Sequence, residues 1–311
     1  MEIKNKKILI TGGTGLLGKH LQEIMPSSEN IIYISSKDYD LTSEVQVKKM
    51  YDDNNPNFVC HMAARVAGIL ENQNKQYDFL QDNILINSLV IDGAIKSGIK
   101  NLIAISSSCA YPDCASSYPM LESQVHESEP TKTNFSYSYA KRLMQVSIDS
   151  ANLQFGLNYQ YLIPCNLYGE YDGFDVRFNH FVSALIKKIH IAKKNGDEKI
   201  ILFGDGTPLR QFLYAKDLAI LIKKCIDDNI TESFNVACND NLSILEMAKI
   251  ALKSCDAEHL KTEFDTDLPS GQFRKDISNK KMMSIFPEFK FTSLEDGIRQ
   301  TYKKAIELNK L

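Results

Sequence analysis

The 311-residue sequence lacks the features that would assign it to several large classes of protein. It contains no Trp, and no apolar run reaches the length of about 18 residues that a membrane span requires. The 36 basic and 39 acidic residues nearly balance, so no broad positive field predicts binding to nucleic acid or to an anionic membrane. Seven cysteines, an odd number at irregular spacing, match neither a disulfide framework nor a zinc site. No cluster of potential ligands predicts a metal.

The amino-terminal segment contains no signal-peptide pattern. Met1–Lys4 leads directly into a strand-like stretch, without the apolar core of a secretory signal. Together with the cysteine usage, this predicts a soluble, reduced, cytoplasmic protein.

Up to about residue 165, short apolar runs alternate with longer amphipathic stretches. The runs are too short for helices, and several are almost continuously apolar, as in a parallel sheet that is covered on both faces. The expected strands are Lys7–Thr11, Ile31–Ile34, Phe58–Met62, Leu102–Ile105 and Tyr159–Ile163. The expected helices are Leu16–Met25, Glu44–Asp53, Phe79–Ser97 and Ser138–Phe155. This alternation predicts an α/β fold with a doubly wound parallel (Rossmann) sheet.

Beyond Pro164 the alternation becomes irregular, which predicts a smaller, mixed α/β C-terminal substrate lobe. We expect helices over Asn179–Lys194, Ala215–Asp227 and Ser243–Ser254, and a strand over Lys199–Phe203. A last helix is expected to begin at Thr292, with Glu295 three residues later as in a capping box. The predicted cofactor domain comprises residues 1–170 and about 212–238, and the predicted lobe comprises residues 171–211 and 239–311. The cleft between them is the expected ligand site.

A glycine-rich loop connects the first expected strand to the first expected helix. Gly12, Gly15 and Gly18 have the spacing GxxGxxG. The first glycine permits a tight turn, the second lets backbone N–H groups approach a pyrophosphate, and the third lets helix and strand pack closely. The context of strand, loop and helix is the one that a dinucleotide site requires. The other residues that we expect to bind the cofactor here are Thr14, Leu16 and Leu17.

The end of the second strand bears on the choice of cofactor. A site for NAD usually has an acidic residue there, which binds the ribose 2′-hydroxyl. This chain has Ser35, Ser36 and Lys37, whose hydroxyls and cation suit a 2′-phosphate, so we predict NADP(H). Asp38 is close enough to keep NAD as an alternative. Asp40 and Leu41 are expected to lie near the adenine.

A Tyr and a Lys four positions apart form the expected proton-transfer group. Tyr137 and Lys141 would lie on one face of a helix, where the ammonium would lower the pKa of the phenol. Ser107, at the end of the preceding strand, would hold a carbonyl oxygen in line for protonation. Tyr139 has no basic residue four positions later. The Tyr–Lys spacing is specific only because it follows the glycine loop and a Ser-rich strand end in one domain.

Nearly the whole chain resembles the extended short-chain dehydrogenase/reductases, and within them the GDP-L-fucose synthase family. The stretches at Ser107–Pro112 and Gly206–Leu213 are specific for that family. The glycine loop and the Tyr–Lys pair are shared across the superfamily. The matching stretches are Met62–Ile69 (MAARVAGI), Ser107–Pro112 (SSCAYP), Pro164–Gly169 (PCNLYG), Asn179–His180, and Gly206–Leu213 (GTPLRQFL).

The resemblance implies a role for each matching position. Ser107, Tyr137 and Lys141 correspond to the reductase triad, and Cys109 and His180 to the base and acid that exchange protons at C3 and C5 of the sugar. Further cofactor contacts are implied for Ala63, Ala64, Pro164, Asn166 and Leu167, and substrate contacts for Ser108, Asn166, Asn179, Lys188, Phe203 and Arg210. The implied ligands are NADP(H) and a GDP-linked 4-keto sugar, and the expected assembly is a homodimer.

The sequence departs from the family pattern at four positions. Thr14, Ser35 and Lys188 stand where the family often has Arg, and Phe203 stands where it often has Trp. These differences leave open a C4 reductase of a GDP-4-keto-heptose, for capsule or surface polysaccharide synthesis, that does not epimerise. A nucleotide-sugar epimerase or dehydratase that retains NAD is a weaker alternative. A non-catalytic NADP-sensing or scaffold protein is a third possibility.

Overall fold

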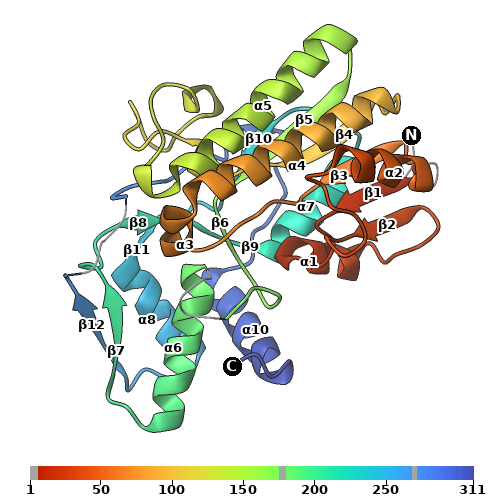
Figure 1. Ribbon diagram of the computed structural model, residues 1–311. Helices are drawn as coiled ribbons and strands as arrows, with labels where there is room; N and C mark the ends of the chain where they lie inside the picture. Colours follow the sequence, from red (N-terminus) through yellow and green to blue (C-terminus); the bar gives the residue numbers. More distant parts are fainter. Residues whose placement is uncertain (1–5, 175–179, 268–271) are drawn as a thin grey trace.

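A parallel six-stranded sheet forms the centre of the molecule. The computed structural model describes residues 6–174, 180–267 and 272–311. The strands lie in the order β10-β5-β4-β3-β1-β2, and all five neighbouring pairs are parallel. Their bounds are β1 Ile8–Thr11, β2 Ile31–Ile34, β3 Phe58–His61, β4 Asn101–Ile105, β5 Asn158–Pro164 and β10 Phe234–Val236. The predicted α/β fold with a parallel Rossmann-type sheet is confirmed (Figure 1).

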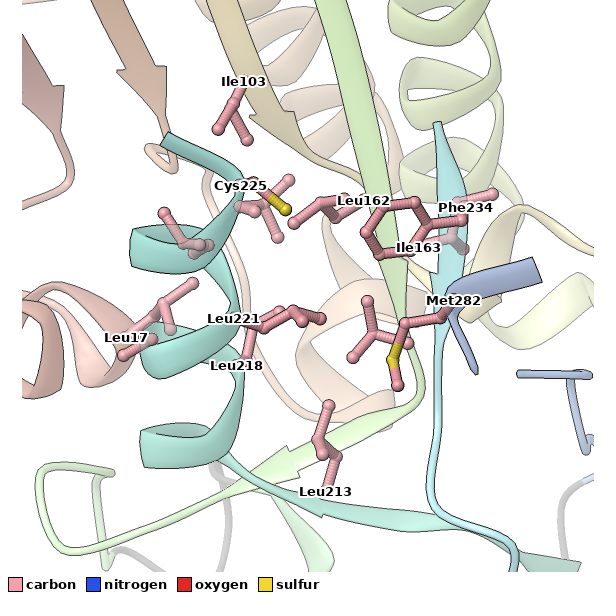
Figure 2. Close-up of a cluster of buried hydrophobic side chains, with 14 of the residues drawn as sticks. Leu17, Ile103, Leu162, Ile163, Leu213, Leu218, Leu221, Cys225, Phe234 and Met282 are labelled. Carbon is pink, nitrogen blue, oxygen red and sulfur yellow. The ribbon is translucent and has the colours of Figure 1, made fainter. Parts of the chain in front are cut away.

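Helices cover both faces of this sheet because alternate residues of each strand point to opposite sides. Leu9 of β1 packs under α2 (Glu44–Asn54), α4 (Gln76–Lys96) and α5 (Phe135–Phe155). Its neighbours Ile8 and Ile10 pack under α1 (Leu16–Ile24) and α7 (Ala215–Asp227). Figure 2 shows the cluster around Ile8 and Ile10, in which Leu17 of α1 lies beside α7 and Leu221 of α7 points toward β5, the strand of Leu162.

The chain changes direction across the sheet at β1. From β2 on one side of β1, it crosses to β3 on the other side, and from there proceeds outward to β4 and β5. Ligands of such sheets bind outside the carboxyl ends of the strands at this reversal. The glycine loop follows β1, and Ala63 and Ala64 follow β3, so both predicted cofactor segments lie at this point.

A third hydrophobic cluster lies among the C-terminal elements. It includes Ile186 of α6 (Phe181–Asn195), Leu202 of β7 (Lys199–Phe203), Ala251 of α8 (Ile244–Ser254) and Ile298 of α10 (Leu294–Glu307). β7 pairs with β12 (Lys261–Asp265), as the lower left of Figure 1 shows. The shorter elements are α3 Ile69–Asn74, β6 Asn166–Tyr168, β8 Leu209–Arg210, β9 Phe212–Tyr214, β11 Leu242–Ser243 and α9 Lys280–Ile285. The residue limits of the two predicted domains stay a prediction.

The predicted start of the last helix is wrong by one residue. Ser293, not Thr292, caps α10 by accepting a hydrogen bond from the backbone N–H of Asp296. Thr292 instead donates its hydroxyl to the carboxylate of Asp217, at 2.8 Å. Thr292 and Ser293 both have side chains that can cap a helix. Because Thr292 is engaged with Asp217, Ser293 takes the capping position.

Among the described residues, we find no helix whose length and apolar character would let it cross a bilayer.

Candidate active site

The glycine loop has the close packing that its spacing predicts. Gly12 has a φ of +74°, and a Cβ there would lie 2.9 Å from the backbone N of Ala63. A Cβ at Gly18 would lie 2.4 Å from the carbonyl oxygen of Gly12, so only glycine lets α1 approach the loop. Gly15 and Thr14 are exposed, which leaves the N-terminus of α1 open to an anion. The loop therefore fits the pyrophosphate of a dinucleotide.

Side chains beneath the loop hold β1 and β3 together. The Thr11 hydroxyl accepts hydrogen bonds from the backbone N–H groups of Met62 and Ala63, both at 3.2 Å, and lies 2.8 Å from Nδ1 of His61. Of the residues predicted to bind the cofactor, Leu17 and Leu41 have buried side chains in the core clusters. Any contact that these two make with a cofactor would therefore come from their backbone. Leu16 and Ala64 are partly exposed beside the loop.

At the end of β2, the Lys37 side chain is exposed, whereas the carboxylate of Asp38 is engaged in hydrogen bonds. Ser36 and Lys37 are exposed. The carboxylate of Asp38 accepts two hydrogen bonds from Ser35, one from the backbone N–H and one from the hydroxyl, both at 2.8 Å. These bonds hold the pKa of Asp38 below its ordinary value and direct its carboxylate into the turn. Asp40 is similarly bonded, to the backbone and hydroxyl of Thr42.

Ser107, Tyr137 and Lys141 meet at the carboxyl end of β4, as predicted. Ser107 lies two residues beyond the end of β4, and its side chain lies close enough to the phenol of Tyr137 to act on the pKa of that group. Lys141, one turn along α5, donates from Nζ to the carbonyl oxygen of Ile105 at 2.7 Å and lies 5.9 Å from the centroid of the Tyr137 ring. The helix is tied to the strand end, because Gln145 also donates to the Ser106 hydroxyl, at 2.7 Å.

The predicted direction of the Tyr137 pKa shift is wrong for this structure. Burial and the adjacent Cys109 raise the pKa of the phenol, and the lowering effect of the Ser107 hydroxyl offsets only part of that shift. Burial also lowers the pKa of Lys141 to about 8. The ammonium is held against the Ile105 carbonyl rather than against the phenol oxygen, so it does not dominate the titration of Tyr137.

Cys109 lies in a short 3₁₀ turn, Ser108–Ala110, among hydrogen-bond donors. Nζ of Lys275 lies 3.0 Å from its Sγ, and Nδ2 of Asn134 lies 3.6 Å from it. Burial alone would raise the pKa of the thiol, but Lys275, Ser107 and His180 outweigh it and lower the pKa below its ordinary value. Cys109 is therefore predisposed to act as a base.

His180 immediately precedes α6 and is paired with a buried carboxylate. Its Nδ1 lies 3.0 Å from Oδ2 of Asp172, and the Ser183 hydroxyl donates to the same oxygen at 2.6 Å. Loss of hydration would lower the pKa of the imidazole, but the bond to Asp172 outweighs it and raises the pKa, with a further contribution from Cys109. The raised pKa favours the protonated, acidic form of His180.

The residues predicted to bind substrate lie on several elements. Arg210 of β8 is partly buried, and the effect of Cys109 on its pKa indicates that the two side chains are near one another. Nζ of Lys188 lies 4.9 Å from the centroid of the Phe203 ring and donates to the carbonyl oxygen of Ile201 at 2.8 Å. Asn179 lies outside the described residues. Ser108 is buried in the 3₁₀ turn that follows β4, and Pro164 is the last residue of β5. Asn166 and Leu167 lie on β6, which pairs with β9.

Sequence reasoning missed three residues of the site. Asn134 lies three positions before Tyr137 and Asp172 lies eight positions before His180, so proximity in the sequence was a signal that could have found them. Lys275 is 166 positions from Cys109 and belongs to none of the motifs. We see no sequence pattern that would have identified it.

Comparison with known proteins agrees with this geometry. Residues 8–237 match the NAD dependent epimerase/dehydratase family. A probable GDP-L-fucose synthase of Drosophila melanogaster is 34% identical, with 97% of this chain and 98% of the relative aligned. The GDP-L-fucose synthase of Azorhizobium caulinodans is 35% identical over 99% of each.

A solved structure extends the comparison to three dimensions. The GDP-L-fucose synthetase of Naegleria fowleri bound to NADP has a TM-score of 0.87 and 29% identity, over 98% of this chain and 95% of that one. The resemblance inferred from the motifs is thus confirmed. The chain belongs to the NAD dependent epimerase/dehydratase family and, within it, to the GDP-L-fucose synthase family.

Proposed function

We propose that this protein uses NADPH to reduce the C4 keto group of a GDP-linked 4-keto sugar, after proton exchange at C3 and C5. The observation that carries the proposal is the convergence of two sets of proton-transfer groups at one end of the sheet. Ser107, Tyr137 and Lys141 form one set, and Cys109 and His180 form the other. The names of the GDP-L-fucose synthases that align over the whole chain support the substrate class.

In the reduction, Tyr137 gives its proton to the oxygen that forms at C4. Its raised pKa keeps it protonated at neutral pH, which is the form that a proton donor needs. Ser107 lies beside the phenol, where its hydroxyl can hold the carbonyl oxygen in line for the proton. When bound, NADPH supplies the hydride. The exposed Lys37 and the hydroxyl of Ser36 support NADP(H), because the carboxylate of Asp38 is already occupied by two hydrogen bonds from Ser35.

The exchange at C3 and C5 requires a base and an acid. The 4-keto group acidifies neighbouring C–H bonds, so a thiolate at Cys109 can remove a proton and His180 can return one from another side, which inverts the centre. The lowered pKa of Cys109 and the raised pKa of His180 place each in the form that its role requires. Arg210 suits the pyrophosphate, because its planar fork matches phosphate oxygens.

Tyr137→Phe tests the reductase assignment. This substitution removes the donated proton, so we expect turnover to fall by about 10²- to 10⁴-fold while NADPH binding remains nearly unchanged. Tyr139→Phe is the matched control, because Tyr139 lies on the same helix with its ring against Phe135 and Arg142. NADPH oxidation and NADPH titration measure the two quantities. Wild-type turnover in Tyr137→Phe would refute the assignment.

Incubation with a GDP-4-keto sugar in heavy water tests the exchange separately. Without NADPH, we expect deuterium at C3 and C5 in the wild type and its loss in Cys109→Ser. NADPH oxidation without any deuterium incorporation would instead identify a plain C4 reductase. The contact of Lys188 with Phe203, at two positions that depart from the family pattern, keeps a GDP-4-keto-heptose as the second candidate substrate. Parallel assays with hexose and heptose substrates distinguish the two.

The assembly that we propose is a homodimer formed through α4 and α5. These helices lie side by side on one face of the sheet, and α5 exposes Leu143, Val146, Leu153 and Phe155. Leu143, Val146 and Leu153 recur at helical spacing on this face, with Leu153 88% exposed, and an exposed apolar stripe of this kind is typical of an interface. A Leu153→Lys variant should shift the sedimentation coefficient from dimer to monomer.

The seven free thiols support the proposed cytoplasmic location.

A further inference from the structure

Lys275 is a buried cation placed directly against the thiol of Cys109. Its side chain is only 6% exposed, and its Nζ lies 3.0 Å from Sγ. A lysine is seldom buried unless a partner compensates its charge. Among the described residues, the hydrogen-bond partner that the structure gives its ammonium is the sulfur of Cys109. The pair therefore has the geometry of an ammonium–thiolate ion pair.

The fold fixes the backbone on both sides of Lys275. The residue before it, Arg274, pairs with Leu209 in a short parallel bridge. Two residues after it, Ile277 pairs with Met120, and its backbone N–H donates to the Gln211 side chain at 2.9 Å. The segment is thus held between the strand that carries Arg210 and the loop after Cys109. This arrangement holds Lys275 at the sulfur through backbone contacts, independently of its own side chain.

The other groups around Cys109 do not replace the charge of Lys275. Ser107 and Asn134 are neutral donors. His180 contributes positive charge only while it is protonated, and Asp172 pairs with it. Arg210 lies nearby but directs its guanidinium to the carbonyl oxygen of Leu209, at 2.8 Å, and Tyr137 is a neutral phenol beside the thiol. Lys275 is the charged group in direct contact with the sulfur.

We infer that Lys275 is a positioning residue that holds Cys109 as a thiolate before substrate binds. The thiol proton is released to solvent when the ion pair forms. The sulfur lone pair can then take a proton from the carbon beside the keto group, and the C–H electrons move into an enolate whose charge rests on the keto oxygen. Nothing is oxidised or reduced in this step. The inference rests on the proposed proton exchange for its purpose, but the ion pair itself can be measured without any sugar.

The test measures the pH dependence of iodoacetamide alkylation at Cys109 in the full-length protein, resolved by peptide mass spectrometry. Cys114 is exposed and serves as an internal reference. In the wild type, we expect the apparent pKa of Cys109 to lie below that of Cys114. In Lys275→Met, the alkylation rate of Cys109 at pH 7 should fall by about tenfold or more relative to Cys114, because an opposite charge at this distance lowers a pKa by about one unit or more.

Two further variants separate charge from structure. Lys275→Arg keeps the charge and should retain most of the wild-type alkylation profile, and Lys290→Met changes an exposed lysine and should leave the profile unchanged. Thermal melting and NADPH titration verify that each variant is folded. Equal apparent pKa values for Cys109 in wild type and Lys275→Met would overturn the inference, as would a wild-type Cys109 that titrates no lower than Cys114. If the alkylation profile of wild-type Cys109 shows a thiolate but no deuterium enters the sugar, the proposed proton exchange is refuted and the inferred ion pair is not.

Discussion

Alanine at Gly18 should weaken the fold around the glycine loop. The new Cβ would lie 2.4 Å from the carbonyl oxygen of Gly12, 2.5 Å from that of Gly13 and 2.6 Å from its carbonyl carbon. All three are backbone atoms, which cannot rotate away, so α1 has to shift from the loop. Overpacking of this kind costs about 3 kcal/mol, and the better helix propensity of alanine returns about 1 kcal/mol. We expect the free energy of unfolding to fall by about 2 kcal/mol.

Gly15→Ala provides the matched comparison. Gly15 has a φ of −76°, which any residue adopts, and its added Cβ would meet only the Gly12 carbonyl oxygen, at 3.4 Å. Stability should therefore change by less than about 1 kcal/mol, the usual range for such a change at a helix cap. The methyl would occupy the exposed side where the pyrophosphate approaches, so the Kd for NADPH should rise by about tenfold.

Denaturant unfolding and fluorescence titration with NADPH measure the two variants. We expect Gly18→Ala to lose stability and Gly15→Ala to lose mainly affinity for NADPH. Wild-type stability in Gly18→Ala would show that the close packing of α1 is misjudged. Wild-type affinity in Gly15→Ala would remove the second glycine from the cofactor site.

Two other predictions concern side chains that position the site. Thr11→Val keeps the shape of the side chain but leaves His61 and two backbone N–H groups without their partner, so unfolding should become easier by about 1–3 kcal/mol, measured by urea denaturation. An unchanged midpoint would contradict that role. Because Asp172 raises the pKa of His180, the imidazolium persists to a higher pH than in an ordinary histidine. Asp172→Asn should therefore move the alkaline limb of deuterium exchange to lower pH, and an unmoved limb would exclude His180 as the acid.

Five of the six strands of the central sheet, β1 to β5, were predicted because their residues are mostly apolar on both faces, whereas the three-residue β10 was missed. Predicted Ile31–Ile34 matches β2, and predicted Phe58–Met62 exceeds β3 by one residue. The short strands β8 and β11 have two residues each, too few to show any period. α4 begins at Gln76, three residues before its predicted start, because its first turn is polar. Periodicity thus locates long, buried elements and misses short ones that pair only through tertiary contacts.

The candidate site was predictable where its residues follow strand ends or share a helix face. Ser107 and Tyr137 illustrate this, because β4 and α5 bring them together in a standard way for this fold. Lys275 could not be predicted, because its position depends on bridges to Leu209 and Met120 that no local pattern encodes. The charge of a catalytic group depends on such contacts, whereas its position depends mainly on the fold.

Tyr137 shows why this distinction matters for chemistry. The Tyr–Lys spacing predicted a phenol made acidic by its neighbour, but burial raises its pKa and Lys141 is engaged with Ile105. A phenol that holds its proton at neutral pH suits keto reduction, in which the proton must be present when the oxygen becomes negative. The ammonium of Lys141, 5.9 Å from the ring centroid, becomes important once the proton has left, because it then faces a phenolate. In the proposed reduction, the role of Lys141 is therefore to stabilise the phenolate that the transfer leaves rather than to prepare the donor.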